Sequence, residues 1–133
     1  MAEVTSIKEM LNAFQKAWSN QDIPRIISFF ADELQFEDIP IGLYATNKVE
    51  LEDILKETFK GVPDFKMEIY EFHEGNGFVV TKWKQSGTMT ISGYGLELKD
   101  FAYETKTTSI IQFNEVGLIT SVSDNWNTGI FYQ

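Results

Sequence analysis

The chain of 133 residues contains no cysteine and a single histidine. The absence of cysteine excludes disulfides, thiol nucleophiles and thiolate metal sites. The single imidazole, His73, excludes a cluster of histidine ligands, and no other spacing of side chains suggests a metal site. The segment Gly93-Tyr94-Gly95 is not a nucleotide-binding fingerprint, because no strand–turn–helix context follows it. We therefore expect a protein that uses neither a metal ion nor a cofactor.

Positive charge is also scarce. The chain has 11 basic and 20 acidic residues, which gives a formal net charge of −9. That charge repels phosphate groups, and no cluster of basic residues interrupts the pattern. The sequence therefore predicts that neither nucleic acid nor an anionic membrane surface is a partner.

Long apolar runs are absent as well. No stretch reaches the roughly 20 residues that a membrane-spanning helix needs. The first ten residues, MAEVTSIKEM, contain acidic side chains and no apolar run, which does not fit a secretory signal. The simplest expectation is a cytoplasmic protein.

Aromatic residues, by contrast, are abundant: 11 Phe, 5 Tyr and 3 Trp. This is more aromatic surface than the core of one small domain needs. The excess is suited to lining a cavity that holds a small molecule.

The first half of the chain has the apolar spacing of amphipathic helices. One helix is predicted over residues 6–20, with Ser6 as its N-cap. A second, short helix begins after Asp22, and a third begins after Asn47 and ends at Gly61.

From residue 65 onward the apolar period changes to two, which is typical of strands. Strands are predicted at 34–38, 65–73, 78–91, 101–113 and 118–126. A turn is predicted at 31–33, and loops at 39–46 and 92–100. Helices gathered before strands indicate one α+β domain over residues 1–133, with a mostly antiparallel sheet.

Several segments match the patterns of one superfamily. They are FQKAWSNQD (14–22), IISFFADELQF (26–36), FEDIP (36–40), PDF (63–65), GLI (117–119) and DNW (124–126). Together they resemble the nuclear transport factor 2-like superfamily, and within it the SnoaL-like branch related to polyketide cyclases. The resemblance implies a cone-shaped, cystatin-like fold in which three N-terminal helices pack on a curved sheet around an apolar pocket. Members include isomerases, cyclases, dehydratases, epoxide hydrolases and proteins without catalysis, so the fold alone does not give the activity.

The resemblance implies a catalytic role for two carboxyl groups. Asp38, at the end of the first strand, matches the general base of ketosteroid isomerases. Asp124, in the last strand, matches a pocket carboxylate of SnoaL-like cyclases and of epoxide hydrolases. Burial and a neighbouring carboxylate both raise a carboxyl pKa, so such a pair can transfer protons near neutral pH. The alternative is that Asp38 caps a loop and Asp124 lies on the surface.

Other positions depart from the patterns of characterised members. Phe14 and Ser109 stand where ketosteroid isomerases place the donors for an oxyanion, so steroid isomerisation is not expected. Trp83 and Gln85 stand where epoxide hydrolases have an arginine and an aspartate, so that water-activating set is incomplete. Asn127 stands where SnoaL-like proteins often have a second aspartate.

Strand alternation predicts which side chains share the pocket with Asp124. The predicted rows are Val79, Thr81, Trp83 and Gln85; Tyr103, Thr105, Thr107, Ser109 and Ile111; and Val122 and Trp126. The expected substrate-binding residues are Phe14, Trp18, Phe36, Tyr44, Trp83, Gln85, Tyr103, Thr107, Ser109 and Trp126. Trp18 is expected either at the floor of the cone or in the ordinary hydrophobic core. Tyr44 and Tyr94 are expected at the mouth of the pocket. A slip of one residue in register reverses every strand assignment, and a sealed core is the alternative.

Two classes of function remain open at this point. The first is a cofactor-free enzyme that acts on a small hydrophobic molecule, with Asp124 as acid/base and Asp38 as base or orienting group. The second is a non-catalytic binding or dimerisation domain of the same fold. The resemblance also implies a homodimer formed through the outer sheet face, which is expected to carry Tyr70, Phe78 and Val80 beside Lys82 and Lys84.

Overall fold

The computed structural model describes residues 6–93 and 95–132. Its elements, in chain order, are α1 (Ile7–Ser19), α2 (Ile23–Ser28), β1 (Phe30–Asp38), β2 (Leu43–Asn47), α3 (Lys48–Gly61), β3 (Lys66–Glu74), β4 (Phe78–Gly93), β5 (Leu96–Phe113), β6 (Ile119–Trp126) and the 3-10 helix η1 (Thr128–Tyr132). This is the predicted α+β class, with three α-helices preceding most of the strands. None of the described helices is long and apolar enough to cross a membrane.

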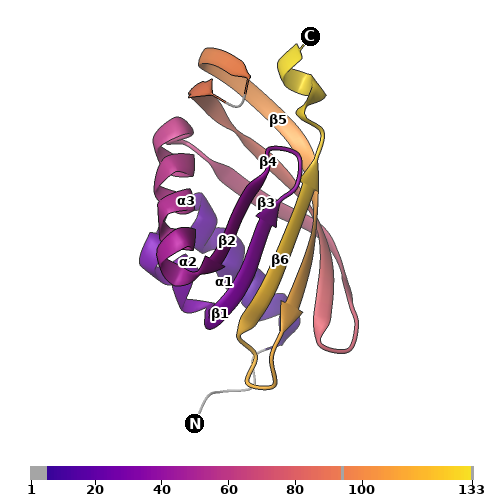
Figure 1. The fold of residues 1–133 in the computed structure, drawn as a ribbon. Coiled ribbons are helices and arrows are strands. Elements are labelled where there is room, and N and C mark those ends of the chain that lie inside the picture. Colours follow the sequence, from indigo (N-terminus) through magenta and orange to yellow (C-terminus); the bar gives the residue numbers. More distant parts are fainter. Residues whose placement is uncertain (1–5, 94, 133) are drawn as a thin grey trace.

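The strands form one sheet in the order β2-β1-β6-β5-β4-β3. Only β1 and β6 run parallel; the other neighbouring strands in the described sheet are antiparallel, as predicted. The three helices lie on one side of the curved sheet, and the far ends of β4 and β5 bend over toward the end of α3 (Figure 1). Register shifts along β3, β4 and β5 accompany this curvature, because an extra residue in one strand bends the ladder. The result is a concave sheet face closed from one side by helices.

Each helix begins after a short polar side chain that accepts a hydrogen bond from a backbone N–H group of the first turn. Ser6 Oγ accepts a hydrogen bond from the backbone N–H of Glu9 (3.1 Å), and Asn47 Oδ1 accepts one from Glu50 (2.9 Å). Asp22 caps α2 in the same way. These caps confirm the three predicted helix starts, because each satisfies a donor that the first turn leaves free.

Three predicted irregular segments are wrong. Residues 31–33 belong to β1, and the segment 39–46 contains most of β2, which pairs with β1. The segment 92–100 continues the β4–β5 ladder, in which Ile91 pairs with Leu98 and Gly93 with Leu96. Hydrogen bonds to a neighbouring strand outweigh the local preference of glycine and polar residues for turns. Tyr94, expected at the pocket mouth, lies outside the described residues.

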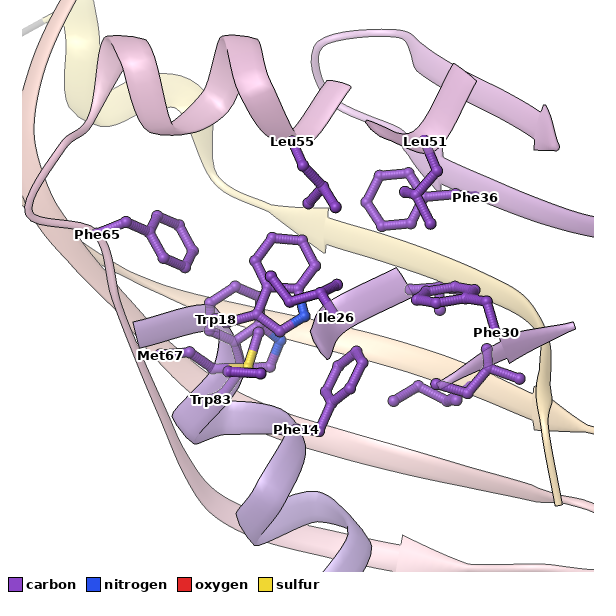
Figure 2. Packing of buried hydrophobic residues seen from close by; sticks show 14 of the residues in the cluster. Phe14, Trp18, Ile26, Phe30, Phe36, Leu51, Leu55, Phe65, Met67 and Trp83 are labelled. Carbon is purple, nitrogen blue, oxygen red and sulfur yellow. The ribbon is translucent and has the colours of Figure 1, made fainter. Parts of the chain in front are cut away.

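Aromatic rings dominate the core between α1 and the sheet (Figure 2). Trp18 lies at the centre of this cluster. Its ring centroid is 6.0 Å from that of Phe14, 5.9 Å from Phe59 and 5.8 Å from Phe65. Edge-to-face and tilted contacts of this kind favour close packing of rings. The cluster fixes α1 and α3 over the sheet and thereby sets the shape of the space above it.

Candidate functional site

Strand alternation places the predicted rows on the concave face. On β4 the residues Val79, Thr81, Trp83 and Gln85 are all buried, while their neighbours are more exposed. The same holds on β5 for Tyr103, Thr105, Thr107, Ser109 and Ile111, and on β6 for Val122, Asp124 and Trp126. The predicted register is therefore confirmed. Six of these inward side chains are polar, which is unusual for a sealed core.

A cavity of about 780 Å³ opens between α3, the β4–β5 hairpin, the ends of β1 and β6, and η1. Its size falls in the range of small-molecule pockets. The aromatic residues that line it are Trp18, Phe36, Phe65, Trp83, Tyr103, Trp126 and Phe131. Asp38 and Asp124 are the carboxyl groups on its sheet wall, and Asp53, Glu57 and Lys60 of α3 lie at its other side.

The carboxyl groups of Asp38 and Asp124 come from adjacent strands. In the parallel ladder between β1 and β6, Asp38 is the direct partner of Asp124. Paired residues of neighbouring strands project from the same sheet face, about 4.8 Å apart at their backbones. The two side chains therefore enter the cavity side by side. Ion pairs in the described part of the chain join other side chains, so neither carboxylate has a cationic partner there.

Asp124 is held by a chain of two hydrogen bonds. Trp83 Nε1 donates to Ser109 Oγ (2.8 Å), and Ser109 Oγ donates to Asp124 Oδ1 (2.5 Å). Burial raises the pKa of Asp124 to about 7; the bond from Ser109 opposes this shift, and the nearby charge of Asp38 adds to it. The carboxyl group of Asp124 therefore keeps its proton to a higher pH than an ordinary aspartate does.

Asp38 is held by one indole directly. Trp126 Nε1 donates to Asp38 Oδ1 (2.9 Å). Burial raises the pKa of Asp38 to about 6, while the hydrogen bonds from Trp126 and from the backbone N–H of Ile41 oppose the shift. Asp38 therefore ionises at a lower pH than Asp124.

A second polar group occupies the wall made by β4 and β5. The Tyr103 hydroxyl donates to Gln85 Oε1 (2.8 Å), and Gln85 Nε2 donates to Thr107 Oγ1 (3.4 Å). Burial raises the pKa of Tyr103, so its hydroxyl keeps its proton at neutral pH. Gln85 and Tyr103 line the cavity, and they supply it with polar groups that carry no charge.

A profile of the SnoaL-like domain matches residues 11–122 of the chain. The chain belongs to the SnoaL-like domain family. A search of curated proteins found no match.

Solved structures share the fold of this SnoaL-like domain at low sequence identity. One is a hypothetical protein with a ketosteroid isomerase-like fold from Catenulispora acidiphila, in complex with trimethylamine: 14% identity, TM-score 0.81, covering 95% of this chain and 91% of that one. Another is a proposed SnoaL-like polyketide cyclase from Shewanella denitrificans: 14% identity, TM-score 0.78, covering 90% and 89%. A third is a proposed polyketide cyclase from Xanthomonas campestris: 14% identity, TM-score 0.76, covering 95% and 94%. Other structures with the same fold are described as a nuclear transport factor 2-like protein from Cytophaga hutchinsonii and a cystatin-fold protein from Novosphingobium aromaticivorans, so the chain has the nuclear transport factor 2-like, cystatin-like fold.

The SnoaL-like domain places most of the predicted site residues around its cavity. Asp38, Asp124, Trp18, Phe36, Trp83, Gln85, Tyr103 and Trp126 all line it. Ser109 lies one layer deeper, where it contacts Asp124 and borders a separate void of about 10 Å³. Thr107 is buried beneath Gln85 and does not reach the cavity.

Phe14 and Tyr44, also predicted to bind the substrate, do not line this cavity either. Phe14 borders only the small deep void, because α1 directs its ring into the aromatic core. Tyr44 is 53% exposed, since its neighbour Ala45 takes the buried face of β2 and alternation turns Tyr44 outward. Asn127, where the family often has an aspartate, does not line the cavity either; its Oδ1 accepts from the backbone N–H of Gly129.

Sequence reasoning missed the contribution of α3 and of the C-terminal segment. Phe131 of η1 contacts the rings of Tyr103 and Trp126 and closes one side of the cavity. Ile54 and Glu57 line it from α3. The apolar tail IF at 130–131 carried a signal for Phe131, whereas the side of α3 that faces the cavity depends on the packing angle. In the described residues no group of three or more His, Asp or Glu is arranged to hold a metal ion.

Proposed function

We propose that this SnoaL-like domain is a cofactor-free acid/base enzyme that acts on a small hydrophobic molecule held in the cavity. The observation that carries the proposal is the direct pairing of Asp38 with Asp124 inside an aromatic-lined space. Burial of the pair raises both pKa values toward neutrality, to about 6 and about 7. Carboxyl groups tuned in this way transfer protons efficiently at physiological pH.

The two carboxyls have different roles. Asp38, with the lower pKa, is the base that removes a proton from the bound molecule, and Asp124 is the acid that delivers one. The charge of ionised Asp38 disfavours ionisation of Asp124, so the two titrations are coupled. Since both side chains leave the same face of the sheet, removal and delivery occur on one face of the substrate. This geometry supports isomerisation, cyclisation or dehydration of the kind found among SnoaL-like enzymes.

The walls of the cavity supply binding and orientation. Aromatic rings contact the apolar body of the molecule and exclude water, which strengthens electrostatic effects inside. Gln85 and Tyr103 offer hydrogen bonds that orient a polar substituent. Holding the reacting atom beside the carboxyl pair removes much of the entropic cost of proton transfer.

The test is a generic proton abstraction that needs no knowledge of the natural substrate. The probe is 5-nitrobenzisoxazole, a neutral aromatic molecule. A base removes its C3 proton while the ring N–O bond breaks, and coloured 2-cyano-4-nitrophenolate forms. We expect a rate per carboxylate about 10²-fold above that of acetate, because the base is desolvated and positioned.

Variants assign the roles in this assay. Asp38→Asn should abolish the excess rate, whereas Asp124→Asn should retain it and move the pH inflection of the rate to lower pH. The rise in rate with pH should have its midpoint near 6, the pKa of Asp38. A wild-type rate no higher than that of acetate, or an unchanged rate in Asp38→Asn, contradicts the proposal.

A second candidate is non-catalytic binding of a small molecule. The specific observation is the trimethylamine bound by the Catenulispora protein of the same fold. Aromatic faces and buried carboxylates without a cationic partner are suited to a small ammonium ion. Calorimetric titration with trimethylammonium should show affinity that increases above pH 7 and is lost in Asp124→Asn. If the wild-type protein then also shows no activity on 5-nitrobenzisoxazole, binding is the favoured function.

We also propose that the protein is a cytoplasmic homodimer without nucleic-acid or membrane partners. Tyr70, Phe78 and Ile110 are partly exposed on β3, β4 and β5, and Val80 pairs with Ile110 in the same ladder. Lys82 and Lys84 on this face form ion pairs with glutamates of neighbouring strands. The apolar side chains are therefore the main surface available for association with a second molecule. A second copy of the chain is the occupant that this superfamily favours.

A further inference from the structure

The carboxyl of Asp124 is connected to Trp83 through a single hydroxyl group. The chain crosses three neighbouring strands, from Trp83 on β4 through Ser109 on β5 to Asp124 on β6. Ser109 and Asp124 are direct partners in the β5–β6 ladder. The three side chains therefore lie across the floor of the concave face, and all are buried.

The chemistry of the donors fixes the direction of this chain. An indole N–H donates only, and a serine hydroxyl has one proton to give. Because Trp83 donates to Ser109 Oγ, the hydroxyl proton of Ser109 is free to point at Asp124 Oδ1. A proton on Oδ1 would turn that hydroxyl away from its acceptor and leave a buried O–H without a partner. Oδ1 is therefore kept as an acceptor in both ionisation states.

We propose that Trp83 and Ser109 are positioning residues that confine the exchangeable proton of Asp124 to Oδ2. The proposal rests on the role of Asp124 as the acid described above. It gives the pocket one defined proton-delivery atom instead of two equivalent oxygens. A defined atom matters for catalysis because proton transfer depends on the position of the donor relative to the reacting atom.

Asp38 also accepts a hydrogen bond from an indole, but without an intervening hydroxyl group. Trp126 Nε1 donates directly to Asp38 Oδ1, so that an indole again occupies one carboxyl oxygen. The two tryptophans thus act on different carboxyls, Trp126 without and Trp83 with an intervening hydroxyl. This difference supplies a matched control, because removal of each indole N–H should affect a different aspartate.

Other titratable groups face the same space and have to be followed in the same experiment. They are Asp38 on β1, Tyr103 on β5, and Asp53, Glu57 and Lys60 on α3. Of these, Asp38 is the group whose charge acts on Asp124. A change that reaches Asp124 through the hydrogen-bond chain should leave the titration of Asp38 nearly unchanged, apart from this coupling.

The experiment is an NMR titration of the side-chain carboxyl carbons in the wild type and in Trp83→Phe, Ser109→Ala, Ser109→Thr and Trp126→Phe. Loss of a hydrogen bond to a carboxylate raises its pKa, by about one unit for a typical bond to a charged group. We expect the pKa of Asp124 to rise by about one unit in Ser109→Ala and by less in Trp83→Phe. Ser109→Thr keeps a hydroxyl group, so the pKa of Asp124 should stay at its wild-type value. Trp126→Phe should raise the pKa of Asp38 instead.

A second readout uses the unmodified protein. The indole N–H resonance of Trp83 should shift with the same midpoint as the carboxyl carbon of Asp124, because the hydroxyl of Ser109 transmits the charge. In Ser109→Ala that coupled shift should disappear. This readout tests the role of Trp83 and Ser109 even if a tryptophan variant does not fold.

The outcomes separate this proposal from the proposed function. A raised pKa of Asp124 that is the same in the wild type, Trp83→Phe and Ser109→Ala overturns the positioning role and leaves the acid/base assignment standing. An indole resonance of Trp83 that does not follow Asp124 overturns it as well. If Asp124 titrates as an ordinary aspartate in the wild type, the proposed function itself fails.

Discussion

Asp38 and Asp124 are direct partners in the parallel ladder between β1 and β6, although 86 positions separate them in the chain. Neither is paired with a lysine or arginine in the described residues, and each accepts a hydrogen bond that traces back to an indole. The sheet thus brings two uncompensated carboxyl groups into one apolar space. Burial in this space raises the pKa values of both carboxyl groups.

The stability of the folded state should decrease as the pH rises from about 4 to about 8. Burial raises the pKa values of Asp38 and Asp124 in the folded protein above the unfolded value of 3.8. The folded state therefore binds more protons than the unfolded state in this window, and stability is lost as the pH passes the folded pKa values. A shift from 3.8 to about 7 at Asp124 corresponds to at most about 4 kcal/mol.

This prediction is checked by thermal unfolding of the wild type and Asp124→Asn between pH 5 and pH 8.5. The variant should show a shallower decrease of Tm and should exceed the wild type at pH 8.5. Asp53→Asn, which removes an exposed carboxyl on α3, is the control and should follow the wild-type curve. Parallel curves for the wild type and Asp124→Asn would show that Asp124 is not perturbed.

The cavity should accept a neutral apolar dye, and its size should limit that binding. Met89 lines the cavity from β4 and is partly buried. Met89→Trp fills part of the space and should weaken binding of Nile red by about tenfold or more, since close-packed interiors do not readily expand. Met89→Leu nearly conserves volume and should bind as the wild type does. Fluorescence titration measures both, and equal affinity of all three proteins would mean that the dye binds elsewhere.

The proposed dimer should dissociate when a charge enters the apolar outer face. Ile110 is 45% exposed on β5, opposite Val80 on β4. Ile110→Glu buries an unpaired charge in the dimer, which should raise the dissociation constant by about tenfold or more. Val116 is 76% exposed in the turn before β6, and Val116→Glu is the matched control. Sedimentation equilibrium measures the outcome; a wild type that is monomeric at micromolar concentration removes the dimer from the proposal.

The start of α3 should depend on its cap. Asn47 Oδ1 accepts from the N–H of Glu50, while Glu50 Oε1 accepts from the N–H of Thr46 (2.8 Å). Asn47→Ala should reduce the free energy of unfolding by about 1 kcal/mol, because one helix donor loses its partner. Asn47→Asp retains an acceptor and should be close to the wild type. Urea unfolding gives both values, and a loss below about 0.3 kcal/mol in Asn47→Ala would show that water replaces the cap.

The sequence correctly indicated the elements whose signal is local. The helix N-caps Ser6, Asp22 and Asn47 lie within four residues of the groups they bind, and strand alternation depends only on the positions of residues in one strand. The sequence missed β2 and the continuation of the β4–β5 hairpin beyond Ile91. Those segments are strands because a neighbouring strand supplies hydrogen bonds, which no local pattern records.

By itself, therefore, the sequence determined the class of fold and the inward rows of β4, β5 and β6, while its resemblance to the SnoaL-like branch pointed to the two aspartates as candidates. Periodicity and capping act over a few residues and can be read without a structure. The tertiary structure decided that Asp38 and Asp124 are neighbours, that Ser109 and Trp83 lie behind Asp124, and that Tyr44 faces outward. Each of these depends on which strands pair and in what register, and that choice is made by contacts between segments far apart in the chain.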